Sequence, residues 1–138
     1  MLVVPRLICG LFTVLFTASF TASFSQAQTL TEGSLWKNTK NSLLLITKID
    51  STKNIFGGTF VNYATGFPQC VGVGVPISGE ISGSDVKFVA NFAPCSKTIT
   101  VWKGTISGST ITSTYDLRYV DVNYDIQPDT GSDTFTKQ

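Results

Sequence analysis

The sequence predicts an all-β protein whose eight antiparallel strands close into an up-and-down barrel. Three observations lead to this fold class. Apolar and polar residues alternate with a period of two after about Leu35, β-branched and aromatic residues are abundant, and helical periodicity is absent. Turn residues interrupt the alternation roughly every ten positions. The connections are too short for a crossover, so we expect consecutive strands to pair antiparallel in chain order.

The predicted strands follow one another along most of the chain. In order, we expect them at residues 35–38, 42–50, 55–64, 76–82, 85–91, 98–107, 110–118 and 132–137. Residues suited to tight turns separate several of them, at 39–41, 51–54, 83–84 and 108–109. Pairing the last strand with the first would remove both exposed edges of the sheet. A closed barrel of eight strands has an interior that holds side chains and one small ligand.

Residues 1–27 have the pattern of a signal peptide. Arg6 provides a positive charge, an uncharged run of apolar and small residues covers 7–24, and small residues stand at Ser25 and Ala27, the positions that a signal peptidase reads. We therefore expect cleavage near Ala27 and a secreted or periplasmic product. Residues 28–138 are enough for one barrel domain with one core.

Composition argues against several classes of function. The formal net charge is +1 and the Lys and Asp residues are scattered singly, so we expect neither nucleic acid nor a membrane as a partner. The chain has no His, and two isolated Cys cannot complete a metal site. Acid–base or nucleophilic chemistry also lacks candidate residues, since only one carboxylate is expected inside the barrel. We therefore expect neither an enzyme nor a cofactor.

Two of the three cysteines remain after the predicted cleavage. Cys70 and Cys95 form an even pair in a chain bound for an oxidising compartment, which predicts a disulfide. They lie in the two longer connections, 65–75 and 92–97, so the bridge would link two loops at one end of the barrel. Closing a loop of about 25 residues contributes roughly 3 kcal/mol in the chain-entropy model. The bridge could serve stability alone or also border a ligand site.

Alternation also predicts which side chains point into the barrel. With Trp102 chosen as inward, the inward set is Ser42, Leu44, Ile46, Phe60, Asn62, Phe88, Ala90, Phe92, Thr98, Thr100, Gly104, Ile111, Ser113, Tyr115, Leu117, Asp133 and Phe135. An unpaired polar group in an interior costs roughly 1–3 kcal/mol, so hydroxyls, an amide and a carboxylate here indicate a ligand. Taken singly they also have structural explanations: Asn38 and Ser42 could cap a turn, and Asp133 could belong to one.

An ordered set of short segments covers nearly the whole of residues 28–138. The segments are Trp36-Lys37-Asn38, Asn41-Ser42, Gly58-Thr59-Phe60-Val61-Asn62, Pro76-Ile77-Ser78-Gly79, Thr98-Ile99-Thr100-Val101-Trp102-Lys103-Gly104, Tyr115-Asp116-Leu117 and Gly131-Ser132-Asp133-Thr134-Phe135-Thr136. In order and spacing they resemble the avidin/streptavidin family, and especially its short dimeric members such as rhizavidin. This resemblance implies an avidin-like barrel that binds biotin.

The resemblance also implies a role for each inward polar residue. Asn38 and Ser42 match donors to the ureido oxygen of biotin, and preorganised donors suit the partial negative charge on that atom. Asp133 and Asn62 match the acceptors of the two ureido N–H groups, and Thr100 matches a hydroxyl beside the ring sulfur. The other matched ligand contacts are Phe92, Trp102, Tyr115 and Leu117 around the bicycle and chain, and Thr98 with residues 65–69 at the carboxylate.

Departures from the family pattern imply a weaker complex. Phe60 stands where the family usually has a Tyr that gives a third donor to the ureido oxygen. Phe92 and Tyr115 replace Trp, and Lys40 replaces an apolar or small residue near the mouth. The lost donor and the smaller rings together remove roughly 3–5 kcal/mol, or two to four decades in dissociation constant. The biotin complex of streptavidin is among the tightest known, so the resemblance still implies measurable binding.

The resemblance to the avidin family, taken with two features of this sequence, implies a homodimer. No Trp occurs between Leu117 and Asp133, where tetrameric relatives carry one that they lend to a neighbouring subunit. Short dimeric members also link the two loops that hold Cys70 and Cys95. Two other readings stay open: the same barrel could bind a different small molecule, or it could be a structural secreted protein without a ligand.

Overall fold

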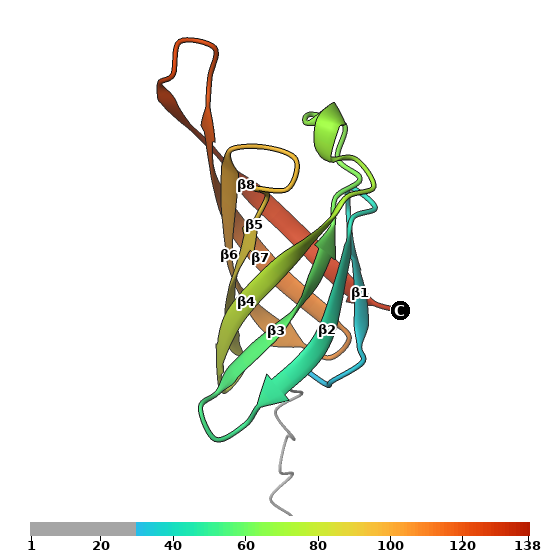
Figure 1. Cartoon of the computed structure of the whole chain (residues 1–138). Helices are drawn as coiled ribbons and strands as arrows, with labels where there is room; N and C mark the ends of the chain where they lie inside the picture. Colours follow the sequence, from blue (N-terminus) through green and yellow to red (C-terminus); the bar gives the residue numbers. More distant parts are fainter. Residues whose placement is uncertain (1–29) are drawn as a thin grey trace, which may run out of the picture.

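The computed structural model describes residues 30–138, which form a closed barrel of eight antiparallel strands (Figure 1). The elements are β1 (Leu35–Asn38), β2 (Leu43–Asp50), β3 (Ile55–Val61), the 3₁₀ helix η1 (Pro68–Cys70), β4 (Gly74–Ser82), β5 (Asp85–Asn91), β6 (Thr98–Ser107), β7 (Thr110–Val120) and β8 (Ile126–Lys137). The predicted fold class is confirmed. The predicted signal peptide, residues 1–27, lies outside the described residues.

The barrel closes through β1, which pairs with β2 on one side and β8 on the other. Trp36 lies opposite Leu44 on β2 and opposite Lys137 on β8. Every strand of the described chain therefore has two neighbours, although β1 is short and pairs only with residues 43–45 of β2 and 135–137 of β8. The register shifts once in β2, between Ile46 and Lys48. Beside this bulge a side chain at Gly58 would collide with the Leu45 carbonyl group, so the close approach requires glycine.

The strand bounds differ from the predicted ones mainly in the last hairpin. β8 begins at Ile126, six residues before the predicted start at 132, and β7 runs on to Val120. Side chains there are exposed, with 93% for Val122 and 71% for Ile126, so the stretch has no buried face and no alternation to detect. Backbone pairing with β7 holds it instead. The other differences are smaller: β2 begins at Leu43 rather than 42, β4 begins at Gly74 rather than 76, and β3 ends at Val61 rather than 64, where the side chain of Asn62 bonds its own loop.

The two ends of the barrel differ in the length of their connections (Figure 1). The short turns 51–54, 83–84 and 108–109 lie at one end, which we call the closed end. The connections 39–42, 62–73, 92–97 and 121–125 lie at the other, the open end. Buried apolar side chains fill the closed end and the barrel middle: Trp36, Leu44, Ile46, Phe56, Ile77, Val86, Phe88, Ile106, Ile111 and Phe135. These side chains do not fill the open end, where a ligand site could therefore lie.

No helical segment in residues 30–138 has the length and apolar character needed to cross a membrane. The same part of the chain also contains no cluster of three or more His, Cys, Asp or Glu residues that could hold a metal ion.

Candidate ligand-binding pocket

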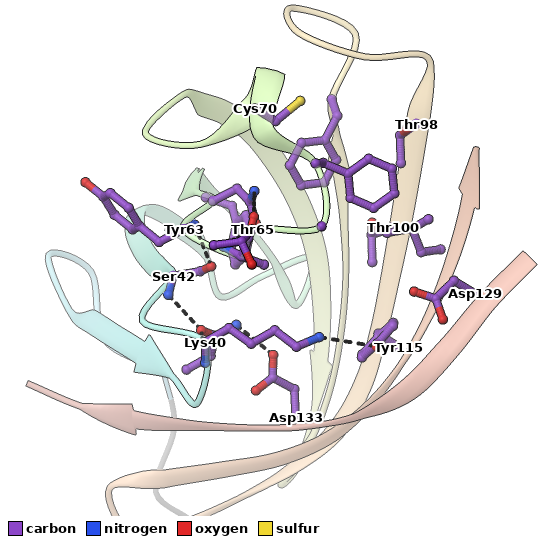
Figure 2. Close-up of a pocket in the computed structure, with 18 of the residues that line it drawn as sticks. Lys40, Ser42, Tyr63, Thr65, Cys70, Thr98, Thr100, Tyr115, Asp129 and Asp133 are labelled. Atoms are coloured by element: carbon purple, nitrogen blue, oxygen red, sulfur yellow. Dashed lines mark hydrogen bonds between the residues drawn. The ribbon is translucent and has the colours of Figure 1, made fainter. Parts of the chain in front are cut away.

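A cavity of about 470 Å³ opens at the open end of the barrel (Figure 2). Of the predicted segment 65–69, Thr65, Gly66 and Phe67 line it, whereas Pro68 and Gln69 do not. The residues predicted singly as ligand contacts all line it: Asn38, Ser42, Phe60, Asn62, Phe92, Thr98, Thr100, Trp102, Tyr115, Leu117 and Asp133. They come from five of the eight strands, β1, β3, β6, β7 and β8, and from the β1–β2, β3–β4 and β5–β6 connections, so the barrel closure brings them together. The structure places these residues around one cavity, and their contacts with a ligand stay a prediction.

Asn38 and Asp133 meet at the bottom of the pocket although 95 residues separate them. The Asn38 amide Nδ2 donates to Asp133 Oδ2 over 2.6 Å. The other oxygen, Oδ1, accepts hydrogen bonds from Thr39 Oγ1 at 2.9 Å, the Thr134 backbone N–H at 2.9 Å and the Thr39 backbone N–H at 3.3 Å. These bonds offset the hydration that the carboxylate loses when it is only 5% exposed. The carboxylate is thereby held in one orientation.

Backbone groups hold Asn38 and Ser42 in place. The Asn38 side-chain oxygen accepts from the backbone N–H of Ser42 at 2.7 Å and of Lys40 at 3.1 Å. The Ser42 hydroxyl oxygen accepts from the Tyr63 backbone N–H at 2.9 Å. These bonds use neither the hydroxyl hydrogen of Ser42 nor the second amide hydrogen of Asn38. We call Asn38, Ser42 and Asp133 the pocket floor: it presents two fixed donors beside one fixed acceptor.

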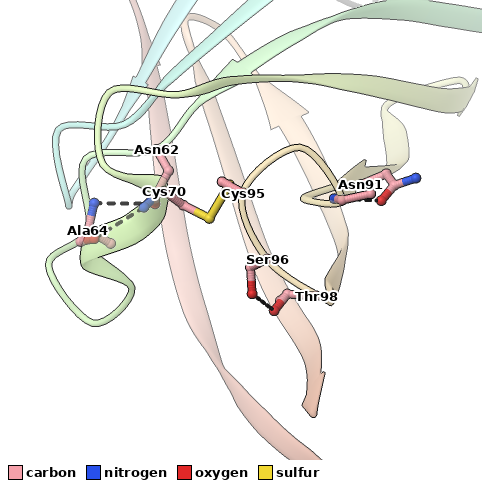
Figure 3. Close-up of a disulfide and its surroundings, with 8 residues drawn as sticks. Asn62, Ala64, Cys70, Asn91, Cys95, Ser96 and Thr98 are labelled. Carbon is pink, nitrogen blue, oxygen red and sulfur yellow. Dashed lines mark hydrogen bonds between the residues drawn. A yellow bond between two sulfur atoms is a disulfide. The ribbon is translucent and has the colours of Figure 1, made fainter. Parts of the chain in front are cut away.

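Asn62 is oriented by its own loop. Its side-chain oxygen accepts from the Ala64 backbone N–H at 3.2 Å, and its Nδ2 donates to the Ala64 carbonyl at 3.1 Å (Figure 3). Both ends of the amide therefore serve the start of the β3–β4 connection. The second lone pair of the oxygen can still accept, so its predicted contact with a ureido N–H stays a prediction.

Aromatic rings form one side of the pocket. The Phe60 ring lies 5.0 Å from that of Trp102 and meets the Phe92 ring edge-on at 6.1 Å, as centroid distances. Trp102 is stacked on Phe88, which belongs to the filled part of the barrel, with 5.0 Å between centroids and planes 11° apart. The apolar side of the pocket is therefore supported from below by the core, which favours a fixed shape.

Two polar atoms in this part of the molecule are buried and lack a hydrogen-bond partner among residues 30–138. They are Thr100 Oγ1 and Trp102 Nε1. Thr100 is only 1% exposed and lines the pocket. An unsatisfied buried group costs about 1–3 kcal/mol. A bound ligand with a polar atom beside Thr100 would remove that cost, which makes the hydroxyl an argument for a ligand in this cavity.

Some lining residues were not predicted as ligand contacts. They are Lys40, Asn41, Tyr63, Ala64, Cys70, Ser96 and Asp129. Asp129 was missed because the predicted last strand starts at 132. It lies four residues before Asp133 and therefore on the same face of β8, but no alternation in this exposed stretch marks it as strand. Lys40 was noted only as a departure from the family pattern.

The disulfide Cys70–Cys95 is confirmed, with Cα atoms 5.3 Å apart (Figure 3). It joins η1 in the β3–β4 connection to the β5–β6 connection. Cys70 is 1% exposed and itself lines the pocket. The backbone N–H of Cys95 donates to the carbonyl of Phe92, another lining residue, at 2.8 Å. The bridge therefore links two loops and borders the cavity, so the two predicted readings of it are compatible.

A closed antiparallel barrel with a polar floor and an aromatic side at one end defines a small-molecule-binding β-barrel. Its fold matches that of bradavidin2 in complex with biotin, with a TM-score of 0.72 and 38% identity over 79% of this chain and 99% of that chain. The chain therefore belongs to the avidin family, as the sequence resemblance implied.

Two other solved structures of the family are similar. Apo shwanavidin in its P21 form gives a TM-score of 0.68 at 26% identity, over 80% of this chain and 98% of that chain. The rhizavidin–biotin complex gives 0.67 at 25% identity, over 76% and 98%. A scan of protein-family models and a search of curated protein sequences produced no match.

Proposed function

We propose that this protein binds biotin in its pocket without catalysing a reaction. The observation that carries the proposal is the pocket floor, where Asn38 and Ser42 each keep a free donor hydrogen beside the Asp133 carboxylate. A cyclic urea has one carbonyl oxygen flanked by two N–H groups, which is the complement of this arrangement. Two family members of similar structure, bradavidin2 and rhizavidin, were solved with biotin bound.

In the proposed complex the ureido oxygen of biotin accepts from Asn38 and Ser42, and one ureido N–H donates to Asp133. The other ureido N–H faces Asn62. The sulfur of the second ring lies beside the Thr100 hydroxyl, which lacks a partner among the described residues. The aromatic side of the pocket covers the apolar faces of the bicycle. Because backbone bonds already orient the floor, little conformational entropy is lost when the ligand enters.

We propose further that the affinity is lower than that of streptavidin. Phe60 is 2% exposed and lines the pocket, and its ring presents carbon where the family usually presents a tyrosine hydroxyl. A hydrogen bond to a charge-like oxygen contributes about 1.5–3 kcal/mol, and its loss alone weakens binding by one to two decades. The floor donors that remain support a complex that is still measurable.

Calorimetric titration of the purified protein with biotin tests the binding proposal. We expect saturable binding at one site per chain, weakened about 10- to 100-fold in Ser42→Ala because one donor to the ureido oxygen is lost. Ser78→Ala makes the same chemical change on the exposed outer face of β4 and should leave the affinity unchanged. Absence of both heat and a thermal shift with excess biotin would refute the proposal. A panel of desthiobiotin and unrelated heterocycles would then search for another ligand.

We propose that residues 1–27 are removed during export and that the mature protein is located outside the cytoplasm, either secreted or periplasmic. The disulfide supports this, because such bonds persist in oxidising compartments. The product exported from a bacterial host should begin at Gln28 when sequenced from its N-terminus. Retention of the full chain inside the cell would contradict export.

The proposed assembly is a homodimer. Support comes from the absence of Trp between Leu117 and Asp133 and from the bridged loops of Cys70 and Cys95. Size-exclusion chromatography with light scattering should give twice the mass of the mature chain. A stable tetramer in the same measurement would contradict the proposal.

A further inference from the structure

Lys40 lies across the opening of the pocket. It belongs to the turn between β1 and β2, and its ammonium group reaches Tyr115 on β7 (Figure 2). Nζ donates to the Tyr115 hydroxyl at 3.2 Å and lies 4.5 Å from the centre of its ring. The side chain is exposed. The ammonium is therefore held at the edge of the cavity by contacts that are individually weak and easily exchanged.

Asp129 brings the opposite charge to the same opening. It is exposed on β8, opposite Leu117 on β7, and lines the pocket together with Lys40. None of the ion pairs formed within residues 30–138 includes Lys40 or Asp129. We call these two residues the pocket mouth. Lys40 and Asp129 both line the cavity, but they form no ion pair with each other.

The charges of the pocket are thus arranged in two tiers. In the floor, Asp133 is buried and held by fixed donors, and its Oδ2, which accepts only from Asn38, keeps a lone pair for an N–H of the ligand head. In the mouth, Lys40 and Asp129 are exposed, and each can interact with a charge on the part of a bound ligand that extends out of the pocket. A ligand whose polar head occupies the floor must direct its tail toward this mouth.

We propose that the pocket mouth selects ligands by the charge of their tail, with Lys40 favouring a free carboxylate and Asp129 opposing it. The inference rests on the proposed function, since it takes the ureido head to lie at the floor. Lys40 has the longer and more flexible side chain and can exchange its contact with Tyr115 for a carboxylate. The protein therefore prefers free biotin to biotin whose carboxylate has been converted to an amide, as it is in conjugates.

The test compares two ligands of nearly the same shape, biotin and its primary amide. Competition titrations at low salt give the ratio of the two dissociation constants for the wild type, Lys40→Gln, Asp129→Asn and Lys40→Arg. Exposed charge pairs change binding by up to about fivefold, so we expect an acid preference of that order in the wild type. Lys40→Gln should remove most of it, Lys40→Arg should keep it, and Asp129→Asn should raise it about twofold.

The ratio separates charge selection from a purely steric role of Lys40. If Lys40→Gln changes both affinities by the same factor, Lys40 only covers the pocket and the proposal is overturned. An unchanged or lowered acid preference in Asp129→Asn would also contradict it. Salt at about 0.5 M should bring the wild-type ratio toward one, because exposed charges are screened. If neither ligand binds the wild type, the proposed function itself fails, and charge selection fails with it.

Discussion

The closed and open ends of the barrel use the same strands for different purposes. On β6, Ile106 is buried near the closed end, whereas Thr98 and Thr100 are buried near the open end. On β8, Phe135 is followed toward the open end by Asp133, both inward and buried. Alternation is the same at both ends, and only the chemical type of the inward residue changes. A filled core thereby becomes a hollow pocket within one continuous sheet.

This difference separates the source of stability from the source of function. The closed end buries aromatic and aliphatic side chains against one another, and burial of that kind is the main favourable contribution to folding. The open end buries Asn38, Ser42 and Asp133, whose hydrogen bonds roughly offset the hydration that they lose. We therefore expect substitutions at the closed end to act on the free energy of unfolding, and those at the pocket floor to act on ligand affinity.

The largest effect is expected for Phe56→Ala at the closed end. Phe56 is 5% exposed, and its ring lies against Gly79, where a Cβ would collide with it. Truncation leaves a cavity, so the free energy of unfolding should fall by about 3–5 kcal/mol in urea denaturation. Phe56→Leu should cost clearly less, and both variants that remain folded should keep wild-type biotin affinity. A loss under 1 kcal/mol would contradict the proposed role of this end.

Removal of the disulfide should have the next largest effect. Cys70→Ala/Cys95→Ala should lower the free energy of unfolding by roughly 3 kcal/mol, because the bridge closes a loop of 25 residues and restricts the unfolded chain. Alanine avoids placing a hydroxyl at the buried Cys70 position. A thiol reductant should destabilise the wild type to a similar extent and leave the double variant unaffected. Equal stability of the oxidised wild type and the variant would rule out this contribution.

Phe60→Tyr should raise biotin affinity by about 10- to 100-fold, since the hydroxyl would supply the missing donor to the ureido oxygen. Phe60 lines the pocket, and the change adds one oxygen to its ring. Calorimetry measures the gain, and the unfolding midpoint without ligand should stay near that of the wild type. Unchanged or weaker affinity in a folded variant would show that the hydroxyl cannot reach the ligand, and would break the proposed link between Phe60 and reduced affinity.

The smallest effect concerns the projecting β7–β8 hairpin. The pKa of Asp121 lies below its ordinary value of 3.8, mainly because Gln127 donates to the carboxylate and secondarily because the backbone N–H of Asp125 does. A pKa lowered by folding contributes stability above the unfolded value, and that stability is lost as the pH falls through the folded value. The wild type should therefore be slightly more stable than Asp121→Asn at neutral pH.

Acidification provides the check on Asp121. Urea denaturation of both proteins should show their small difference shrinking as the pH falls below the ordinary value of 3.8 and through the lowered pKa of Asp121. Because Asp121 does not line the pocket, pocket affinity at neutral pH should be the same in both. A difference that grows on acidification would mean that the sign of this contribution is wrong.

Much of the pocket was predictable because strand alternation is a local property. Choosing Trp102 as inward was enough to place Thr98, Thr100 and Phe92 around the cavity where the structure has them. The same method failed where burial ends: Asp129 lies in a part of β8 that projects beyond the core, so no hydrophobic pattern marks the strand. The loop bonds of Asn62 with Ala64 likewise have no signal in the pattern.

The inward faces, the turns and the cysteine pair could be predicted from the amino-acid sequence, because each depends on residue type at short spacing. The hydrogen bond that Asn38 and Asp133 share across 95 residues could not, because it forms only when the barrel is folded. That contact depends on the register of β1 against β8, which places Asn38 opposite Phe135. Register comes from closure of the whole barrel, where burial of many side chains is satisfied at once, and no single segment contains it.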